Sequence, residues 1–358
     1  MLTSPADAAA NRAQEPYYPW FDWLRGTLAL LVMLAHDNLI HWSNAGNFAV
    51  QVFFALSGWL IGRVLIRTPR AGLPRFYFNR AVRIWVPYYI ALALLIAVSL
   101  LRDHIGVKWL EFVLYKATFV YNLLGTPQLA THAAEMPLGG TGNHFWSVNT
   151  EEQFYLVAPL LLVLAAPAIG RSRVTWLLLA LLAWATDSWS SIVFGVCAAV
   201  FASYDGTVFQ RPLARVALAV FGVASAAGIA TGLPYERLVP ITAICIVLLL
   251  TVQGPRQRLG AVVGGMSYPL YLNHWIGTYA ANALTGPFGW RDTFVSHLLS
   301  ALIAIGLAVA LYLKIERPLL ARRSAWFTVA LGRRAAITAY LMVGVGLALG
   351  LVFRLAAP

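Results

Sequence analysis

Charged residues are scarce in this chain of 358 residues. They make up 11% of the sequence, against roughly 25% in an average soluble domain, whereas 60% of the residues are hydrophobic and the mean hydropathy is +0.70. So few charges cannot cover a water-facing surface, which excludes a soluble globule, and the 13% of aromatic residues excludes a disordered chain. The sequence therefore predicts an all-α polytopic helical bundle surrounded by membrane lipid.

Cysteine is scarce as well, and the common metal and nucleotide signatures are missing. The two cysteines, Cys197 and Cys245, lie in apolar segments, which excludes a disulfide framework and a cysteine metal site. We find no zinc-binding histidine pair, no glycine-rich phosphate loop and no GxSxG elbow, so no metal is expected. No basic stretch precedes an apolar core between Met1 and Pro19, so we expect no cleavable signal peptide.

Long apolar segments dominate what is present. A hydrocarbon core about 30 Å thick requires about 20 mostly apolar residues per helix. Candidate spans lie near residues 22–40, 48–66, 84–101, 153–169, 174–187, 189–203, 214–231, 238–253, 264–284, 296–314 and 335–355. The stretch from Trp109 to Leu124 is either interfacial or re-entrant, so ten to twelve spans fit and about ten or eleven are expected.

The net charge of +12 is explained by where the basic residues lie. They fall between the apolar segments, as topology signals do, and this argues against a nucleic-acid partner. With a cytoplasmic N-terminus, all but six of the 26 basic residues lie inside; the six are Arg102, Lys108, Lys116, Arg237, Arg291 and Arg354. This bias predicts a cytoplasmic segment over residues 1–21 and a membrane domain over residues 22–358, with the C-terminus outside.

Two ionisable residues mark the first span. Arg25 lies at its cytoplasmic end and His36 follows eleven residues later, which places both on nearly one helix face, about 16 Å apart along the axis. An ionisable residue within a membrane is a functional candidate, and the alternative for His36 is a neutral side chain satisfied by a neighbouring helix. The alternative for Arg25 is an ordinary topology charge.

Further candidates come in pairs and triplets at helical spacing. Arg80 and Arg83 lie one turn apart and form a fork suited to phosphate, although they could simply hold the loop inside. Ser147, Glu151 and Tyr155 recur every four residues and share one face if their helix starts early. Glu151 could then orient His36 or receive its proton, or serve only as a charge at a helix N-terminus.

The last two candidates are His274, beside Asn273 in a late span, and Glu316 at a cytoplasmic boundary. His274 is expected to support the structure or the substrate rather than to catalyse. Glu316 is expected to pair with an inner arginine such as Arg80 or Arg83, because a carboxylate at the boundary needs a cation. The long outer loop before Ser147 is glycine-rich and is expected to be functional.

The order of these motifs resembles the acyltransferase-3 family of integral membrane acyltransferases. The resemblance is carried by Arg25 and His36 at R-x10-H spacing, FFALSGWLIGR at 53–63, FYFNRAVRIWVPYY at 76–89, FWSVNTEEQFYLVAPLLL at 145–162, SYPLYLNHW at 267–275 and IERPL at 315–319. One departure is SVNTEEQFY, where Asn149 and Thr150 replace the small or apolar residues common in the family. We also expect no SGNH esterase-like domain, so the chain would act alone or with a separate envelope partner protein.

The resemblance implies transfer of an acyl group, commonly acetyl from acetyl-CoA, to a hydroxyl of a glycan or glycolipid outside the cytoplasm. Arg80 and Arg83, with Arg25, would bind the phosphates of the acyl-CoA, and His36 would be the general base, with Glu151 and Arg25 completing the catalytic set. Ser147, Tyr155, His274 and Glu316 would bind substrate or support the site. Such a protein would modify cell-envelope polysaccharide from the bacterial inner membrane.

Two other functions fit the same residues. In a proton-coupled transporter of a small solute or polysaccharide precursor, His36, Glu151 and Arg25 would relay protons without cleaving a thioester. In a non-catalytic assembly partner, His36→Ala would leave function intact. Within the acyltransferase hypothesis, direct attack by the acceptor is favoured over an acyl group carried on His36.

Overall fold

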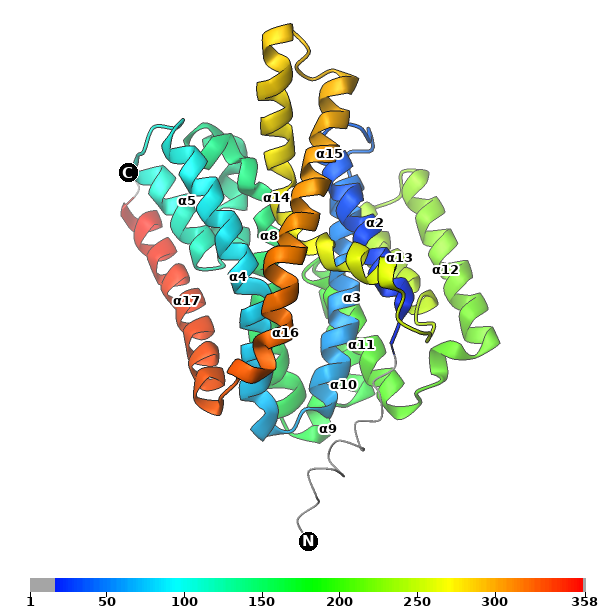
Figure 1. Cartoon of the computed structure of the whole chain (residues 1–358). Helices are drawn as coiled ribbons and strands as arrows, with labels where there is room; N and C mark the ends of the chain where they lie inside the picture. Colours follow the sequence, from blue (N-terminus) through cyan, green and yellow to red (C-terminus); the bar gives the residue numbers. More distant parts are fainter. Residues whose placement is uncertain (1–16, 357–358) are drawn as a thin grey trace.

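The computed structural model describes residues 17–356, and within them every regular element is a helix (Figure 1). The expectations for the first residues, including the absence of a signal peptide, concern mainly residues 1–16, outside the described range. The α-helices are α2 (Pro19–His36), α3 (Ala45–Arg67), α4 (Leu73–Leu100), α5 (Val107–Ala117), α6 (Tyr121–Leu124), α7 (Leu129–His132), α8 (Phe145–Pro159), α9 (Pro167–Gly170), α10 (Arg173–Ala185), α11 (Ser190–Tyr204), α12 (Pro212–Ala230), α13 (Tyr235–Leu249), α14 (Arg258–Thr285), α15 (Phe294–Leu311), α16 (Arg317–Trp326) and α17 (Val329–Ala356).

Short 3-10 and π segments join or extend these helices. The 3-10 segments are η1 (Arg70–Gly72), η2 (Thr126–Gln128), η3 (Ala133–Glu135), η4 (Pro137–His144), η6 (Val208–Gln210) and η7 (Gly286–Phe288). The π segments are η5 (Leu160–Leu164), which follows Pro159, and η8 (Tyr312–Glu316). Each π segment continues an α-helix. One long helix is therefore formed by α8 and η5, and another by α15, η8 and α16.

Every predicted span overlaps a helix, which confirms the all-α polytopic membrane fold. Five stretches among the described residues are long and apolar enough to cross a membrane by length and composition: Ala45–Arg67, Arg70–Leu100, Pro212–Ala230, Phe294–Trp326 and Val329–Leu355. The helices α10 and α11 are apolar but shorter. The total of ten or eleven crossings stays a prediction.

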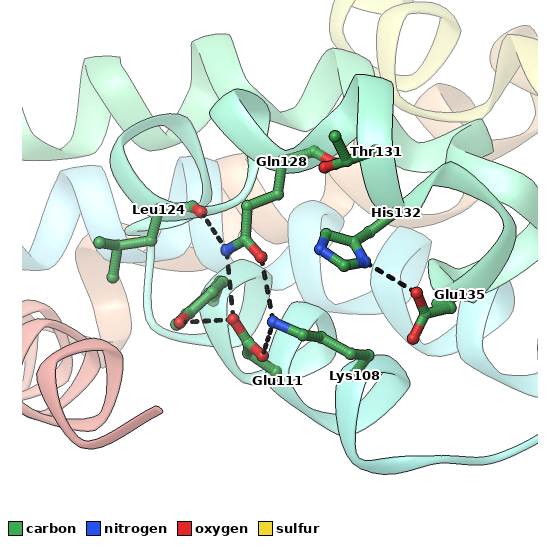
Figure 2. Close-up of polar contacts among 8 residues, drawn as sticks. Lys108, Glu111, Leu124, Gln128, Thr131, His132 and Glu135 are labelled. Atoms are coloured by element: carbon green, nitrogen blue, oxygen red, sulfur yellow. Dashed lines mark hydrogen bonds and ion pairs between the residues drawn. The ribbon is translucent and has the colours of Figure 1, made fainter. Parts of the chain in front are cut away.

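The long outer connection between α4 and α8 is folded into short helices. The expected interfacial or re-entrant stretch forms α5 and α6. Helix α5 packs against α17 (Figure 1), and Leu124 of α6 lies against Gly350 of α17. A polar network ties α5 to η2: Glu111 pairs with Lys108 (2.9 Å) and accepts from Gln128 (3.2 Å), as Figure 2 shows. Because one buried carboxylate joins two elements, this segment is a packed part of the protein.

Helices α3 and α11 approach so closely that only glycine fits between them. A Cβ atom on Gly58 would lie 2.0 Å from the backbone oxygen of Ile192, and one on Gly195 would lie 2.2 Å from that of Ala55. Small residues allow such backbone approach in membranes, where association depends on packing rather than on the hydrophobic effect. The pair Gly58 and Gly195 therefore sets the position of α3, which carries part of the site described below.

Replacing Gly58 with alanine is expected to destabilise the bundle. Its methyl group would overlap the backbone of α11, and overpacking of this kind costs about 1 to 3 kcal/mol. We expect the melting temperature in detergent to fall by at least about 2 °C. The matched control is Gly306→Ala in α15, where nothing lies within 4 Å of the added atom; an equal loss in both variants would contradict the close-packing argument.

Candidate active site

A cavity of about 110 Å³ lies among α2, α3, α4, α8 and α14. Its charged lining consists of three arginines and one glutamate, which are four of the predicted site residues. Its lining residues are Arg25, Val50, Phe53, Phe54, Ser57, Arg80, Arg83, Ile84, Ser147, Val148, Glu151, Tyr155, Ser267, Tyr268 and Tyr271. Predicted residues from three separate motifs therefore meet at one place, here called the inner cavity.

The lining of the inner cavity contains three guanidiniums and one carboxylate. Arg25 pairs with Asp22 at 3.1 Å. The guanidinium of Arg80 lies 5.6 Å from the centre of the Tyr155 ring, and its Nε atom is buried without a hydrogen-bond partner. No ion pair of the described residues includes Arg80 or Arg83. Such a set of guanidiniums suits a polyanionic ligand, because arginine binds phosphate through paired hydrogen bonds.

The predicted face of α8 is confirmed. The helix begins at Phe145, early enough for Ser147, Glu151 and Tyr155 all to line the inner cavity. Glu151 accepts hydrogen bonds from Ser57 and from Tyr155. The adjacent Glu152 faces elsewhere, as its 100° rotation predicts, and accepts from Trp85 at 2.8 Å.

A second cavity, of about 410 Å³, opens beyond the first and contains His36. It is lined by Val32, Ala35, His36, Asn38, Ile40, His41, Trp42, Ser43, Gly46, Asn47, Val50, Asn143, His144, Trp146 and Tyr271. This is the outer cavity, since His36 ends α2 whereas Arg25 lies near its start. Val50 and Tyr271 line both cavities, so the two are separated by a wall about one side chain thick.

Three histidines form a cluster at the outer cavity. The His36 and His274 rings stack with centroids 4.9 Å apart and planes at 1°, and the His144 ring lies 4.7 Å from His274 and 6.0 Å from His36. His144 and His274 are buried, whereas His36 is exposed. His36 and His144 both line the outer cavity, and His36 is the exposed member, so it is the more accessible to a ligand there.

Backbone carbonyls set the protonation of the two buried histidines. His274 Nδ1 lies 2.9 Å from the oxygen of Tyr271, and His144 Nε2 lies 3.2 Å from that of Leu272. A carbonyl only accepts, so the ring nitrogen in each contact carries the hydrogen. Each buried ring is thereby fixed in one tautomer and one orientation, and the fixed His274 ring gives His36 a rigid stacking surface.

His144 and Tyr271 were not among the predicted site residues. The turn before His144 uses positive φ angles at Leu138, Gly139 and Gly140 (51°, 61° and 85°). The Tyr271 hydroxyl donates to the backbone oxygen of His144 at 2.7 Å. The sequence shows the glycines of this turn and the SYPLYLNHW motif separately. Only the fold shows that the turn and the helix that carries Tyr271 meet at His144.

Two predicted contacts differ in the structure. Glu151 does not orient His36. It lies seven residues after His144, a member of the histidine cluster, and therefore about 10 Å deeper along the helix. Its carboxylate accepts hydrogen bonds from Ser57 and Tyr155 instead. Glu316 is buried with one carboxylate oxygen unpartnered, and Arg83 lies near enough to act on its charge, but Glu316 forms no ion pair within 4.0 Å with Arg80 or Arg83. Both arginines face the inner cavity, whose lining does not include Glu316.

The comparison with protein families decides the identity of this arrangement. A family model described as an acyltransferase domain matches residues 18–313, which is most of the chain. The chain belongs to the acyltransferase-3 family. The resemblance noted in the motifs is thus confirmed, and the chain contains a membrane acyltransferase domain.

Several bacterial O-acetyltransferases are similar to this acyltransferase. The peptidoglycan O-acetyltransferase OatA of Listeria monocytogenes is 23% identical over 241 residues, which cover 64% of this chain and 36% of the relative. A putative O-acetyltransferase of Staphylococcus aureus is 29% identical over 156 residues, covering 41% and 25%. This acyltransferase therefore spans about a third or less of the length of these curated relatives. No solved structure matches it.

Proposed function

We propose that this acyltransferase moves an acyl group, acetyl by preference, from cytoplasmic acyl-CoA to a hydroxyl of an extracytoplasmic glycan or glycolipid. The observation that carries the proposal is the pair of cavities sharing the wall of Val50 and Tyr271. One cavity is lined by arginines and the other by His36. A polyanionic donor and a hydroxyl acceptor can therefore approach the same wall from opposite sides.

The arginines of the inner cavity are proposed to bind the donor. Arg80 and Arg83 follow one another at one helical turn and both line the cavity, with Arg25 opposite on α2. Glu151 limits the positive charge and holds the Tyr155 hydroxyl and Ser57 in place. Ser147, whose hydroxyl lies 2.6 Å from that of Tyr271, supports the wall between donor and acceptor.

His36 is proposed as the general base. Its imidazole takes the proton of the acceptor hydroxyl while the oxygen attacks the thioester carbonyl. The carbon–sulfur bond then breaks, and the CoA thiolate leaves with that proton, which restores neutral His36. The buried His274 and His144 hold the His36 ring in place. In this direct mechanism the ester forms on the acceptor without an acyl group on the enzyme.

The proposed setting is the bacterial inner membrane. Residues 1–21 would lie in the cytoplasm, and residues 22–358 would form one membrane domain. The relatives are bacterial, and one is named for peptidoglycan. By analogy, the acceptor would be a cell-envelope glycan, reached directly or through a separate envelope partner protein.

The test is release of CoA thiol from acetyl-CoA by the purified protein, with and without a crude envelope-glycan acceptor. We expect release that the acceptor stimulates and that depends on His36. No release from a folded protein with any acyl-CoA would favour the transporter. Release that is unchanged in His36→Ala would contradict the assigned base.

A further inference from the structure

A separate polar cavity of about 420 Å³ lies between the end of α4 and the hairpin of α14 and α15. It is lined by Arg102, Thr278, Tyr279, Asn282, Ala283, Arg291 and Asp292, and is here called the Arg102–Arg291 pocket. The hairpin projects beyond the neighbouring helices at the end of the molecule where α5 lies (Figure 1). Arg102 and Arg291 are both on the side predicted to be extracytoplasmic.

The pocket holds two guanidiniums and one carboxylate. Both arginines and Asp292 are exposed, and no ion pair of the described residues includes any of the three. The balance is therefore positive, and the charges remain available to a ligand. Arginine forks of this kind bind carboxylate or phosphate oxygens in pairs.

Neighbouring groups contact both arginines. The Arg102 guanidinium lies 5.4 Å from the centre of the Tyr279 ring, and the Tyr279 hydroxyl lies 3.0 Å from that of Thr141. Arg291 lies against Gly286 so closely that a Cβ atom there would be 2.5 Å from its Nε atom. Because the Arg102 guanidinium is stacked on a ring, less of its side-chain entropy is lost on binding.

The pocket is connected to the histidine cluster. Thr278 lies one turn beyond His274 on the same face of α14. Its hydroxyl donates to Asp37 at 2.7 Å, directly after His36, and the second carboxylate oxygen of Asp37 is buried without a partner. A group bound in the pocket therefore lies about one helical turn further out than the proposed base.

We propose that the Arg102–Arg291 pocket binds a carboxylate or phosphate group of the acceptor glycan and so selects acidic acceptors. The inference rests on the proposed function and names the class of its acceptor. The polar side chains of Thr278, Asn282 and Asp292 favour a glycan over a lipid headgroup, because they offer hydrogen bonds to sugar hydroxyls. The two arginines of the same pocket supply the cations for the acidic group.

Binding of three forms of one sugar tests this proposal. Maltotetraose, its C6-carboxylated form and its C6-phosphorylated form are titrated against the full chain in phosphatidylcholine nanodiscs, without acyl-CoA. We expect the acidic forms to bind at least tenfold more tightly than the neutral form. The double variant Arg102→Gln with Arg291→Gln is expected to lose this preference, and Arg291→Lys, which keeps the charge without the fork, to retain part of it.

The matched control is Arg354→Gln, which removes an exposed outer arginine that does not line the pocket. It is expected to bind like the wild type, and unchanged melting temperatures verify that the variants fold. Equal binding of all three sugars, or an acidic preference that survives the double variant, overturns the proposal. Loss of sugar binding in phosphatidylglycerol nanodiscs would assign the pocket to a lipid headgroup. Because acyl-CoA is absent, failure here is distinct from failure of the thiol-release assay.

Discussion

Replacing His36 with alanine is expected to abolish acyl transfer while leaving CoA binding largely intact. The imidazole lies in the outer cavity, stacked on His274, whereas the arginines line the inner cavity. A positioned general base contributes about 10²- to 10⁴-fold to a rate. We therefore expect acceptor-stimulated thiol release to fall by a factor in that range, measured beside the equilibrium binding of CoA.

The control for this loss is His104→Ala. His104 is exposed and lines neither cavity, so its variant is expected to retain wild-type turnover. Wild-type turnover in His36→Ala would remove His36 from the mechanism. A parallel fall in CoA binding and melting temperature would show that His36 supports the fold instead, which also contradicts its assignment as the base.

Replacing Arg83 with alanine is expected to weaken the binding of CoA. The side chain lines the inner cavity beside Arg80 and has no carboxylate partner within the described ion pairs. A hydrogen bond to a charged group contributes about 1.5 to 3 kcal/mol, so the dissociation constant should rise about 10- to 100-fold. Calorimetric titration with CoA measures the change, and saturating donor should restore much of the turnover.

Arg67→Ala serves as the matched control for Arg83→Ala. Arg67 ends α3 on the same predicted cytoplasmic side, is exposed and does not line the inner cavity. It is expected to bind CoA like the wild type. Equal weakening by the two substitutions would mean that general positive charge, rather than a defined site, attracts the donor.

Local patterns predicted much of this protein correctly. Hydropathy located the helices, because crossing a membrane requires an uninterrupted apolar segment of fixed minimum length. Helical spacing placed Ser147, Glu151 and Tyr155 on one face, since residues four apart lie one above another. The same spacing places Glu152 on a different face, and in the structure its carboxylate accepts a hydrogen bond from Trp85. Both kinds of inference need only one helix at a time.

Contacts between helices required the tertiary structure. The cluster of His36, His144 and His274 draws on three elements far apart in the chain, and neither Glu151 with His36 nor Glu316 with an arginine forms the predicted pair. A sequence determines the period and polarity of each helix by itself. The depth at which one helix stands against another depends on packing across the bundle, as at Gly58 and Gly195, and that depth decides which polar groups meet.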